Sequence, residues 1–164
     1  MILTRIKEGD KVLEVGFGTG QILLEIARKV GETGKVYGIE ISPKMLGKSM
    51  KRVKKYGLSN RVNLRIGDAR KLPYDDDTFD VLFNSYMLDL IDTPEIPQLL
   101  SEFLRVLKPN GRLVLVNMSK NKKKLTFYER LCKMCGGRCG MLGGGCRPIS
   151  TKPFLGKTWI SEYR

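Results

Sequence analysis

Short apolar runs typical of β-strands alternate with segments of helical periodicity through the first 119 residues of this chain. Such alternation favours a parallel sheet, because each helix carries the chain back so that the next strand can run in the same direction. The pattern predicts an α/β domain, a doubly wound sheet with helices on both faces. The expected strands lie at residues 11–16, 35–40, 61–66, 78–83 and 113–116.

The helical segments carry start signals and apolar stripes. Ser42 is a natural N-cap with Pro43 in the first turn, and Thr93 with Pro94 starts the next helix. A turn is expected at residues 109–111 because of their Pro-Asn-Gly sequence. The residues expected to face inward are Met45, Leu46, Met50 and Val53 in the second helix, and Ile96, Leu99, Leu100, Phe103, Leu104 and Leu107 in the third.

Residues 120–164 differ in composition and hold 11 basic and 2 acidic residues, in a chain of net charge +13. Six glycines between residues 136 and 145 favour a loop. We therefore expect a domain over residues 1–119 and a separate basic, Cys/Gly-rich segment over residues 120–164. Its charge suits an anionic membrane or nucleic acid, and equally suits a face that only keeps the protein soluble.

Some classes of protein are disfavoured from the outset. No apolar run approaches the length of a membrane span, and the first residues become charged too early for a signal peptide. We expect a soluble, cytoplasmic protein. Histidine is absent, which excludes Ser-His-Asp and Cys-His nucleophiles and histidine-based metal sites.

Residues 14–20, Glu-Val-Gly-Phe-Gly-Thr-Gly, join the first strand to the first helix. Glycines there allow a tight turn and let a ligand approach the main chain. No Lys-Ser/Thr pair follows Gly20, so this is not a P-loop. The dinucleotide pattern needs its third glycine one residue later, where Gln21 stands, and Glu14 suits a cation better than a pyrophosphate. Nicotinamide dehydrogenase chemistry is therefore a disfavoured alternative.

Two further acidic residues narrow the choice of ligand. Glu40 ends the second strand, where a carboxylate can accept hydrogen bonds from both hydroxyls of a ribose. Asp68 follows the third strand and supplies an acceptor for an adenine amino group, while Ile41 adds an apolar neighbour. A ligand with an adenosine, an ammonium and no phosphate fits best. S-adenosylmethionine has these parts and a sulfonium cation.

These motifs resemble the class I S-adenosylmethionine-dependent methyltransferases, in the branch that includes the ubiquinone/menaquinone-biosynthesis C-methyltransferases (methyltransferase type 11). The resemblance covers about residues 8–118 and is carried by residues 12–20, 38–42, 67–69, 72–74, 79–81 and 102–111. It implies a Rossmann-like sheet of strand order 3-2-1-4-5, with the cofactor at the switch point between strands 1 and 4. It also implies a small-molecule or lipid-like methyl acceptor.

The resemblance assigns roles to individual residues. Glu40 would hold the ribose, Ile41 would pack on the adenine, and Asp68 with the Ala69 amide would read the adenine edge. Asn84 would face the sulfonium and the acceptor. The residues that would hold the methionine end are Glu14, Gly16, Gly18 and Gly20, and Phe17 is a further cofactor-binding candidate.

Methyl transfer is an in-line displacement, so alignment supplies most of the rate gain and a base is needed only if the acceptor must lose a proton. The candidates for a base are Asn84, Tyr86 and Asp89, although Tyr86 also suits a pocket wall and Asp89 a helix start. An RNA methyltransferase is the nucleic-acid alternative. The prolines typical of adenine-amino methylation are missing from residues 84–87, whereas the basic charge favours this alternative.

Four cysteines lie in the C-terminal segment: Cys132, Cys135, Cys139 and Cys146. Four thiolates could hold zinc or an iron–sulfur cluster, but only one Cys-x-x-Cys pair is present. Reduced thiols in a loop are the commoner interpretation. Residues 144–148 also resemble a substrate-side segment of some of these methyltransferases, which favours a pocket role over a metal site.

The two ends of the chain depart from the family pattern. About ten residues precede the first strand, where family members have a covering helix, and residues 157–164 leave room for one short strand instead of two. We expect strands 6 and 7 to be missing or incomplete, as in a truncated copy. A non-catalytic S-adenosylmethionine-binding remnant is therefore a further alternative.

Overall fold

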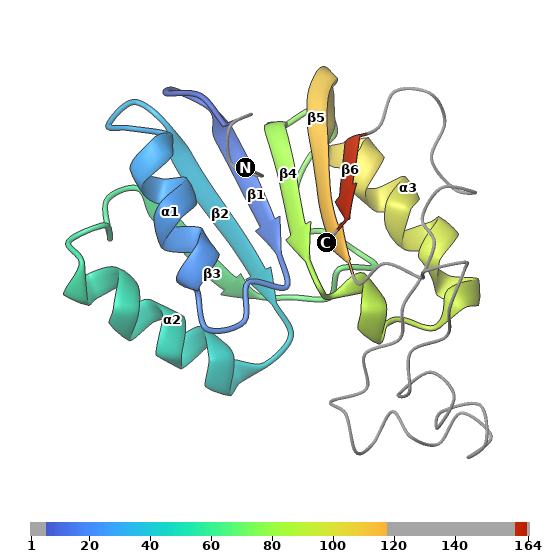
Figure 1. The fold of residues 1–164 in the computed structure, drawn as a ribbon, viewed down its shortest axis with the longest axis horizontal. Coiled ribbons are helices and arrows are strands. Elements are labelled where there is room, and N and C mark those ends of the chain that lie inside the picture. Colours follow the sequence, from blue (N-terminus) through green and yellow to red (C-terminus); the bar gives the residue numbers. More distant parts are fainter. Residues whose placement is uncertain (1–5, 118–159, 164) are drawn as a thin grey trace.

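The computed structural model describes residues 6–117 and 160–163, within which six strands form one sheet of order β3-β2-β1-β4-β5-β6 (Figure 1). Every neighbouring pair in this sheet runs parallel. The expected order 3-2-1-4-5 is confirmed, and one short strand near the C-terminus pairs with β5. The strands are β1 (Lys11–Val15), β2 (Lys35–Glu40), β3 (Val62–Ile66), β4 (Phe79–Ser85), β5 (Leu107–Asn117) and β6 (Ile160–Tyr163).

Helices cover both faces of the sheet, as the alternating pattern predicts. α1 (Gln21–Lys29) and α2 (Pro43–Lys55) lie on one face, and α3 (Ile96–Val106) lies on the other (Figure 1). The chain crosses from the first face to the second between β3 and β4. Two short 3₁₀ turns, η2 (Leu88–Leu90) and η3 (Thr93–Glu95), link β4 to α3.

Each face of the sheet has its own apolar core because successive strand residues point to opposite sides. In β1, Val12 joins the core beneath α1 and α2, whereas Leu13 joins the core beneath α3, and both are fully buried. A sheet packed on both faces in this way gives a rigid support for the loops at its strand ends.

The helix starts agree with the sequence only in part. Ser42 caps α2 as expected, with its Oγ accepting a hydrogen bond from the Met45 N–H at 3.4 Å. Thr93 and Pro94 form η3, and the α-helix proper begins at Ile96.

The expected inward-facing stripes are wrong at two positions. Met50 is 56% exposed and Leu104 is 41% exposed, because both lie at the edge of a stripe whose centre is buried. Ser49 occupies the buried position beside Met50. Leu107 is buried as expected, but it opens β5 and is not part of α3.

The last central strand begins earlier than predicted. β5 starts at Leu107, opposite Phe79, and the pairing resumes with Arg112 opposite Val81. Residues 108–111 therefore bulge from the ladder, and the expected Pro-Asn-Gly turn falls inside this irregularity.

Several predictions fall on residues outside the described part of the chain. They are the domain boundary after residue 119, the glycine-rich loop and the cysteines Cys132, Cys135, Cys139 and Cys146. Among the residues that the structure does describe, no helix combines the length and the apolar character needed to cross a bilayer.

Candidate cofactor site

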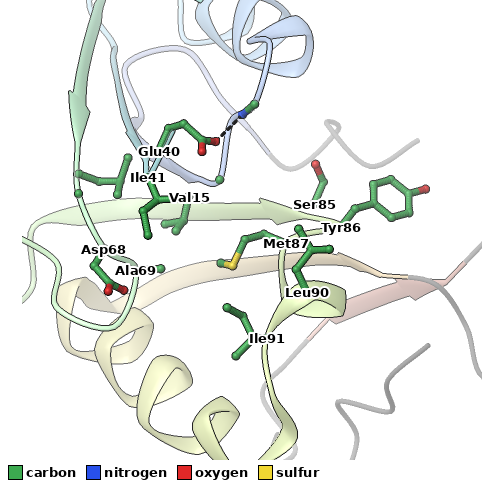
Figure 2. A pocket seen from close by; sticks show the side chains of 14 residues that line it. Val15, Glu40, Ile41, Asp68, Ala69, Ser85, Tyr86, Met87, Leu90 and Ile91 are labelled. Atoms are coloured by element: carbon green, nitrogen blue, oxygen red, sulfur yellow. Dashed lines mark hydrogen bonds between the residues drawn. The ribbon is translucent and has the colours of Figure 1, made fainter. Parts of the chain in front are cut away.

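A cavity of about 300 Å³ opens at the carboxyl ends of β1, β2 and β4 (Figure 2). The strand order reverses between β1 and β4, and the crevice at such a switch point is where open parallel sheets bind ligands. The cavity is lined by Val15, Gly16, Gly18, Ile39, Glu40, Ile41, Gly67, Asp68, Ala69, Ser85, Tyr86, Met87, Leu90 and Ile91.

The glycine loop borders the cavity through its main chain. Gly18 has φ +52°, and a Cβ added there would meet nothing within 4 Å, so its backbone faces open space. Gly20 has φ +72° and caps α1 in the left-handed conformation, which favours glycine. A ligand can therefore lie directly against the peptide at Gly18.

Ser49 fastens this loop from the neighbouring helix. The Ser49 side chain is fully buried, and its Oγ donates a hydrogen bond to the Gly18 carbonyl oxygen at 2.8 Å. A Cβ at Gly20 would stand 2.7 Å from the same Oγ, so α2 packs closely on the loop. Sequence reasoning missed Ser49 because a serine within a helix carries no local signal of a contact made by tertiary packing.

Glu40 is placed at the end of β2 with its carboxylate facing the loop. Its Oε2 accepts a hydrogen bond from the Gly18 N–H at 2.9 Å (the dashed line in Figure 2), and its Oε1 accepts one from the Ser42 N–H at 3.0 Å. Each carboxylate oxygen retains a second lone pair. The Glu40 side chain can therefore brace the loop and still accept two further hydrogen bonds from a ligand.

Asp68 lies at the other end of the cavity, after β3, with Ala69 beside it. The Arg70 guanidinium donates to Asp68 Oδ2 at 2.6 Å and also bonds Glu95 at 2.9 Å. The hydrogen bonds from Arg70 lower the pKa of the Asp68 carboxyl below its ordinary value. Asp68 therefore remains anionic at neutral pH. Ile41 lines the same cavity and is a largely exposed apolar residue.

Glu14 and Phe17 do not line this cavity. They border a second hollow of about 440 Å³ on the other side of the loop, which shares only Ser85 with the first among their lining residues. Glu14 is 2% exposed, and its Oε2 has no hydrogen-bond partner among the described residues. This burial raises the pKa of Glu14 to about 8.

The three candidate bases are placed differently. Tyr86 lines the cavity, is 46% exposed, and has the strained backbone angle φ +56°. Asn84 is fully buried, and its Nδ2 donates to the Val15 carbonyl oxygen at 2.8 Å. Asp89 is fully buried in η2. Ser85, not Asn84, is the residue of the β4 end that reaches the cavity, because neighbouring strand residues face opposite ways.

The wall opposite Glu40 is apolar. Figure 2 shows Met87, Leu90 and Ile91 across the cavity from Glu40, and Leu90 is 52% exposed. This wall could have been predicted from the apolar residues that follow the fourth strand in the sequence. No group of three or more metal-binding side chains occurs in residues 6–117 and 160–163.

Known proteins share this architecture. The family profile described as "Methyltransferase domain" matches residues 12–111. The demethylmenaquinone methyltransferase of Lactobacillus johnsonii is 34% identical over 71% of this chain and 47% of its own length. The ubiquinone/menaquinone biosynthesis C-methyltransferase UbiE of Azotobacter vinelandii is 36% identical over 75% of this chain and 48% of its own length. This chain therefore spans about half the length of these curated relatives.

Solved structures agree with the family profile. The crystal structure of a SAM-dependent methyltransferase from Aquifex aeolicus superposes with a TM-score of 0.63 and 28% sequence identity, covering 80% of this chain and 72% of that chain. The residues that the family profile matches include Gly16, Gly18, Glu40 and Asp68, which the fold brings to one cavity. The chain belongs to the class I S-adenosylmethionine-dependent methyltransferases, in the UbiE-like branch.

Proposed function

We propose that the cavity at the β1–β4 switch point binds S-adenosylmethionine, and that the chain directs its methyl group to a small, largely apolar acceptor of the quinone class. The observation that carries the proposal is Glu40. Its two oxygens are held by the N–H groups of Gly18 and Ser42, and they keep spare acceptor capacity at the edge of the cavity. This arrangement suits the paired hydroxyls of a ribose.

The charges of the lining support a cationic ligand. Glu40 is acidic and has no basic partner among the ion pairs of the described residues, whereas Asp68 is paired with Arg70. No lysine or arginine is among the lining residues described. A sulfonium and an ammonium are stabilised by such surroundings, whereas a pyrophosphate is repelled. Ile41 and Ala69 offer apolar contact to an adenine. Both oxygens of Asp68 accept hydrogen bonds from Arg70, so the Asp68 carboxylate would accept from the adenine amino group by exchanging one of these bonds. The methionine end would follow the open main chain at Gly18.

Bound S-adenosylmethionine supplies a methyl group on a sulfonium, a good leaving group, so the chain's own residues contribute mainly alignment. Met87, Leu90 and Ile91 form the apolar wall against which a flat acceptor would pack. The Tyr86 backbone N–H donates to the Val116 carbonyl oxygen at 2.7 Å, which holds the strained residue at the mouth of the cavity. We propose Tyr86 as the residue that positions the acceptor.

The acceptor class rests on the apolar wall together with the relatives. One relative is named as a demethylmenaquinone methyltransferase and another as a ubiquinone/menaquinone C-methyltransferase. A ring of this kind has an apolar body that matches Met87, Leu90 and Ile91. The name of the second relative gives carbon as the acceptor atom, so the corresponding proposal for this chain is C-methylation.

Calorimetry with S-adenosylmethionine, S-adenosylhomocysteine and NADH tests the cofactor. We expect the first two to bind and NADH not to bind; binding of NADH alone would overturn the proposal. Transfer of labelled methyl to a short-chain demethylmenaquinone tests the acceptor. Leu90→Ala should raise the KM for this acceptor without changing the affinity for S-adenosylmethionine. Cofactor binding without any transfer would contradict the catalytic half and leave the binding half standing.

A further inference from the structure

The outer face of α2 carries a line of lysines. Within this helix, successive spacings of four, three and four residues place four exposed lysines on one face. This is the side opposite the buried Ser49 and Val53, and it points directly into solvent. We call it the lysine face, made of Lys44, Lys48, Lys51 and Lys55. Over 11 residues of helix it extends about 16 Å.

The lysine face is not balanced by acidic groups. α2 contains no aspartate or glutamate, and none of the ion pairs formed by the described residues includes one of its lysines. Glutamates on nearby elements already have arginine partners, Glu25 with Arg28 and Glu32 with Arg61. Like charges three and four residues apart destabilise a helix. Lys55 lies in the last turn, where a cation favours the helix, but the mutual repulsion of Lys44, Lys48 and Lys51 does not stabilise α2.

The exposed apolar residues near α2 lie off the lysine face, Ile41 in the lining of the cofactor cavity and Met50 at the edge of the buried side. Ile41, immediately before the N-cap of α2, is 67% exposed, and Met50 on the side of the helix is 56% exposed. α2 lies beside β3 at one end of the sheet, and no other labelled element covers its outer side (Figure 1). An exposed cationic helix face of this kind matches the head groups at the surface of an anionic bilayer.

We propose that the lysine face of α2 docks this protein on an anionic lipid bilayer. The chemistry favours lipid over nucleic acid. The face is convex, and it has lysine where bidentate phosphate recognition favours arginine. Tyr56 is the aromatic residue next to it, and its ring already contacts the cations of Arg28 and Lys55 at 5.3 and 5.9 Å, instead of standing free to stack on a base. The surface is separate from the cofactor cavity and does not depend on the proposed activity.

Vesicle co-sedimentation of the full chain tests this proposal. We expect binding to vesicles of phosphatidylcholine with 30% phosphatidylglycerol, as a roughly physiological anionic surface, and no binding to phosphatidylcholine alone. Replacing all four lysines with glutamine should weaken the partition about fivefold for each lysine, or roughly 600-fold in total. High salt should abolish the binding of the unaltered protein because it screens these charges.

The chain offers a matched control for charge. Lys120, Lys122, Lys123 and Lys124 form a second group of four lysines in the sequence. Their replacement with glutamine removes the same charge and should leave most of the binding intact. Glutamine and lysine have similar helix propensities, so the α2 variant should melt at the same temperature or higher, since repulsion is relieved.

Three results would overturn the proposal. The first is no preference for anionic vesicles, and the second is loss of binding only in the variant at residues 120–124. The third is lysine-face-dependent binding of a single-stranded RNA oligonucleotide without any binding to vesicles, which would assign the face to nucleic acid.

Discussion

Two buried carboxyl groups lie near the carboxyl ends of neighbouring strands, beside the glycine loop, and their surroundings differ. Glu40 in β2 has each oxygen bonded by a backbone N–H. Glu14 in β1 is 2% exposed, and its Oε2 has no hydrogen-bond partner among the described residues. Main-chain N–H groups replace the hydrogen bonds to water that the Glu40 carboxylate loses. Burial removes water from the Glu14 carboxyl and raises its pKa to about 8. Burial alone therefore does not decide what a carboxyl can do here.

Replacing each of the two residues with glutamine distinguishes them most sharply. The largest expected effect is on the pH dependence of the free energy of unfolding, and it is caused by Glu14. Its pKa in the folded protein lies above the ordinary value of 4.5, so the unfolded chain releases this proton first as the pH rises. The stability that it contributes is complete below pH 4.5 and is lost toward pH 8. The loss amounts to roughly 1.4 kcal/mol per pH unit and roughly 5 kcal/mol overall.

Glu14→Gln should abolish this slope, because the amide does not titrate. Urea unfolding of both proteins at pH 5 and pH 8 measures it, and the comparison concerns the slopes, not the absolute stabilities. Asp68, Asp80 and Glu102 have lowered pKa values, so their effects fall at more acidic pH and do not interfere. Identical slopes in the two proteins would show that Glu14 is solvated.

At Glu40 the same change to glutamine should be harmful to ligand binding. The amide would direct an N–H toward the N–H of Gly18 or Ser42, where the structure requires an acceptor. We expect the affinity for S-adenosylmethionine to fall roughly 100-fold, equivalent to two hydrogen bonds to a charged group.

Calorimetry measures this loss. Glu32→Gln is the matched control, because Glu32 is an exposed partner of Arg61 and lies outside the cavity. If the Glu40→Gln protein bound the cofactor as tightly as the unaltered chain, the ribose assignment would be wrong.

The contribution of the glycine loop to stability and to ligand binding can be tested at Gly18 and Gly20, which both have a left-handed backbone conformation. In Gly20→Ala the new methyl would stand 2.7 Å from Ser49 Oγ, so the free energy of unfolding should fall by roughly 2 kcal/mol. In Gly18→Ala the methyl meets nothing within 4 Å, and the backbone cost is roughly 1 kcal/mol.

The two alanine variants should differ most in ligand affinity. The methyl of Gly18→Ala occupies the space through which a ligand approaches the main chain, so its binding of S-adenosylmethionine should weaken more than its stability loss explains. Thermal melting with and without the ligand separates the two quantities. Equal ligand-induced shifts in Gly18→Ala and the unaltered protein would place the ligand elsewhere.

Local patterns predicted most of the fold. Strand-helix alternation, the Ser42 cap and the glycine loop depend on residues adjacent in sequence, and the structure reproduces them. The order 3-2-1-4-5 came from the family resemblance. The errors at Met50 and Leu104 concern the edges of helical stripes, where periodicity cannot decide between core and solvent without knowing what packs against the helix.

The parts of the site that lie within one short segment of the sequence could be predicted. The glycine loop and Glu40 follow their strands directly, so their place at the cavity could be expected. The orientation of Asn84 could not, because it depends on how the end of β4 pairs with β1. Ser49 reaches Gly18 across 31 positions of sequence, and only the docking of α2 brings them together.

The smallest expected effect concerns that docking. Ser49→Ala removes the donor to the Gly18 carbonyl oxygen and leaves this acceptor without its hydroxyl partner. We expect a stability loss of about 1 kcal/mol and a cofactor affinity about fivefold weaker, since the loop that offers its N–H to Glu40 is held less firmly. Calorimetry and the KM for S-adenosylmethionine measure the effect on the loop.

Val53→Ala is the control for a merely structural role. Val53 lies on the same buried face of α2 and contacts the core, so its truncation should cost at least as much stability, about 1–3 kcal/mol. It does not bond the glycine loop, and its variant should bind the cofactor normally. If both variants lost affinity in proportion to their stability, Ser49 would act only through the packing of α2, and Glu40 alone would hold the loop in its binding conformation.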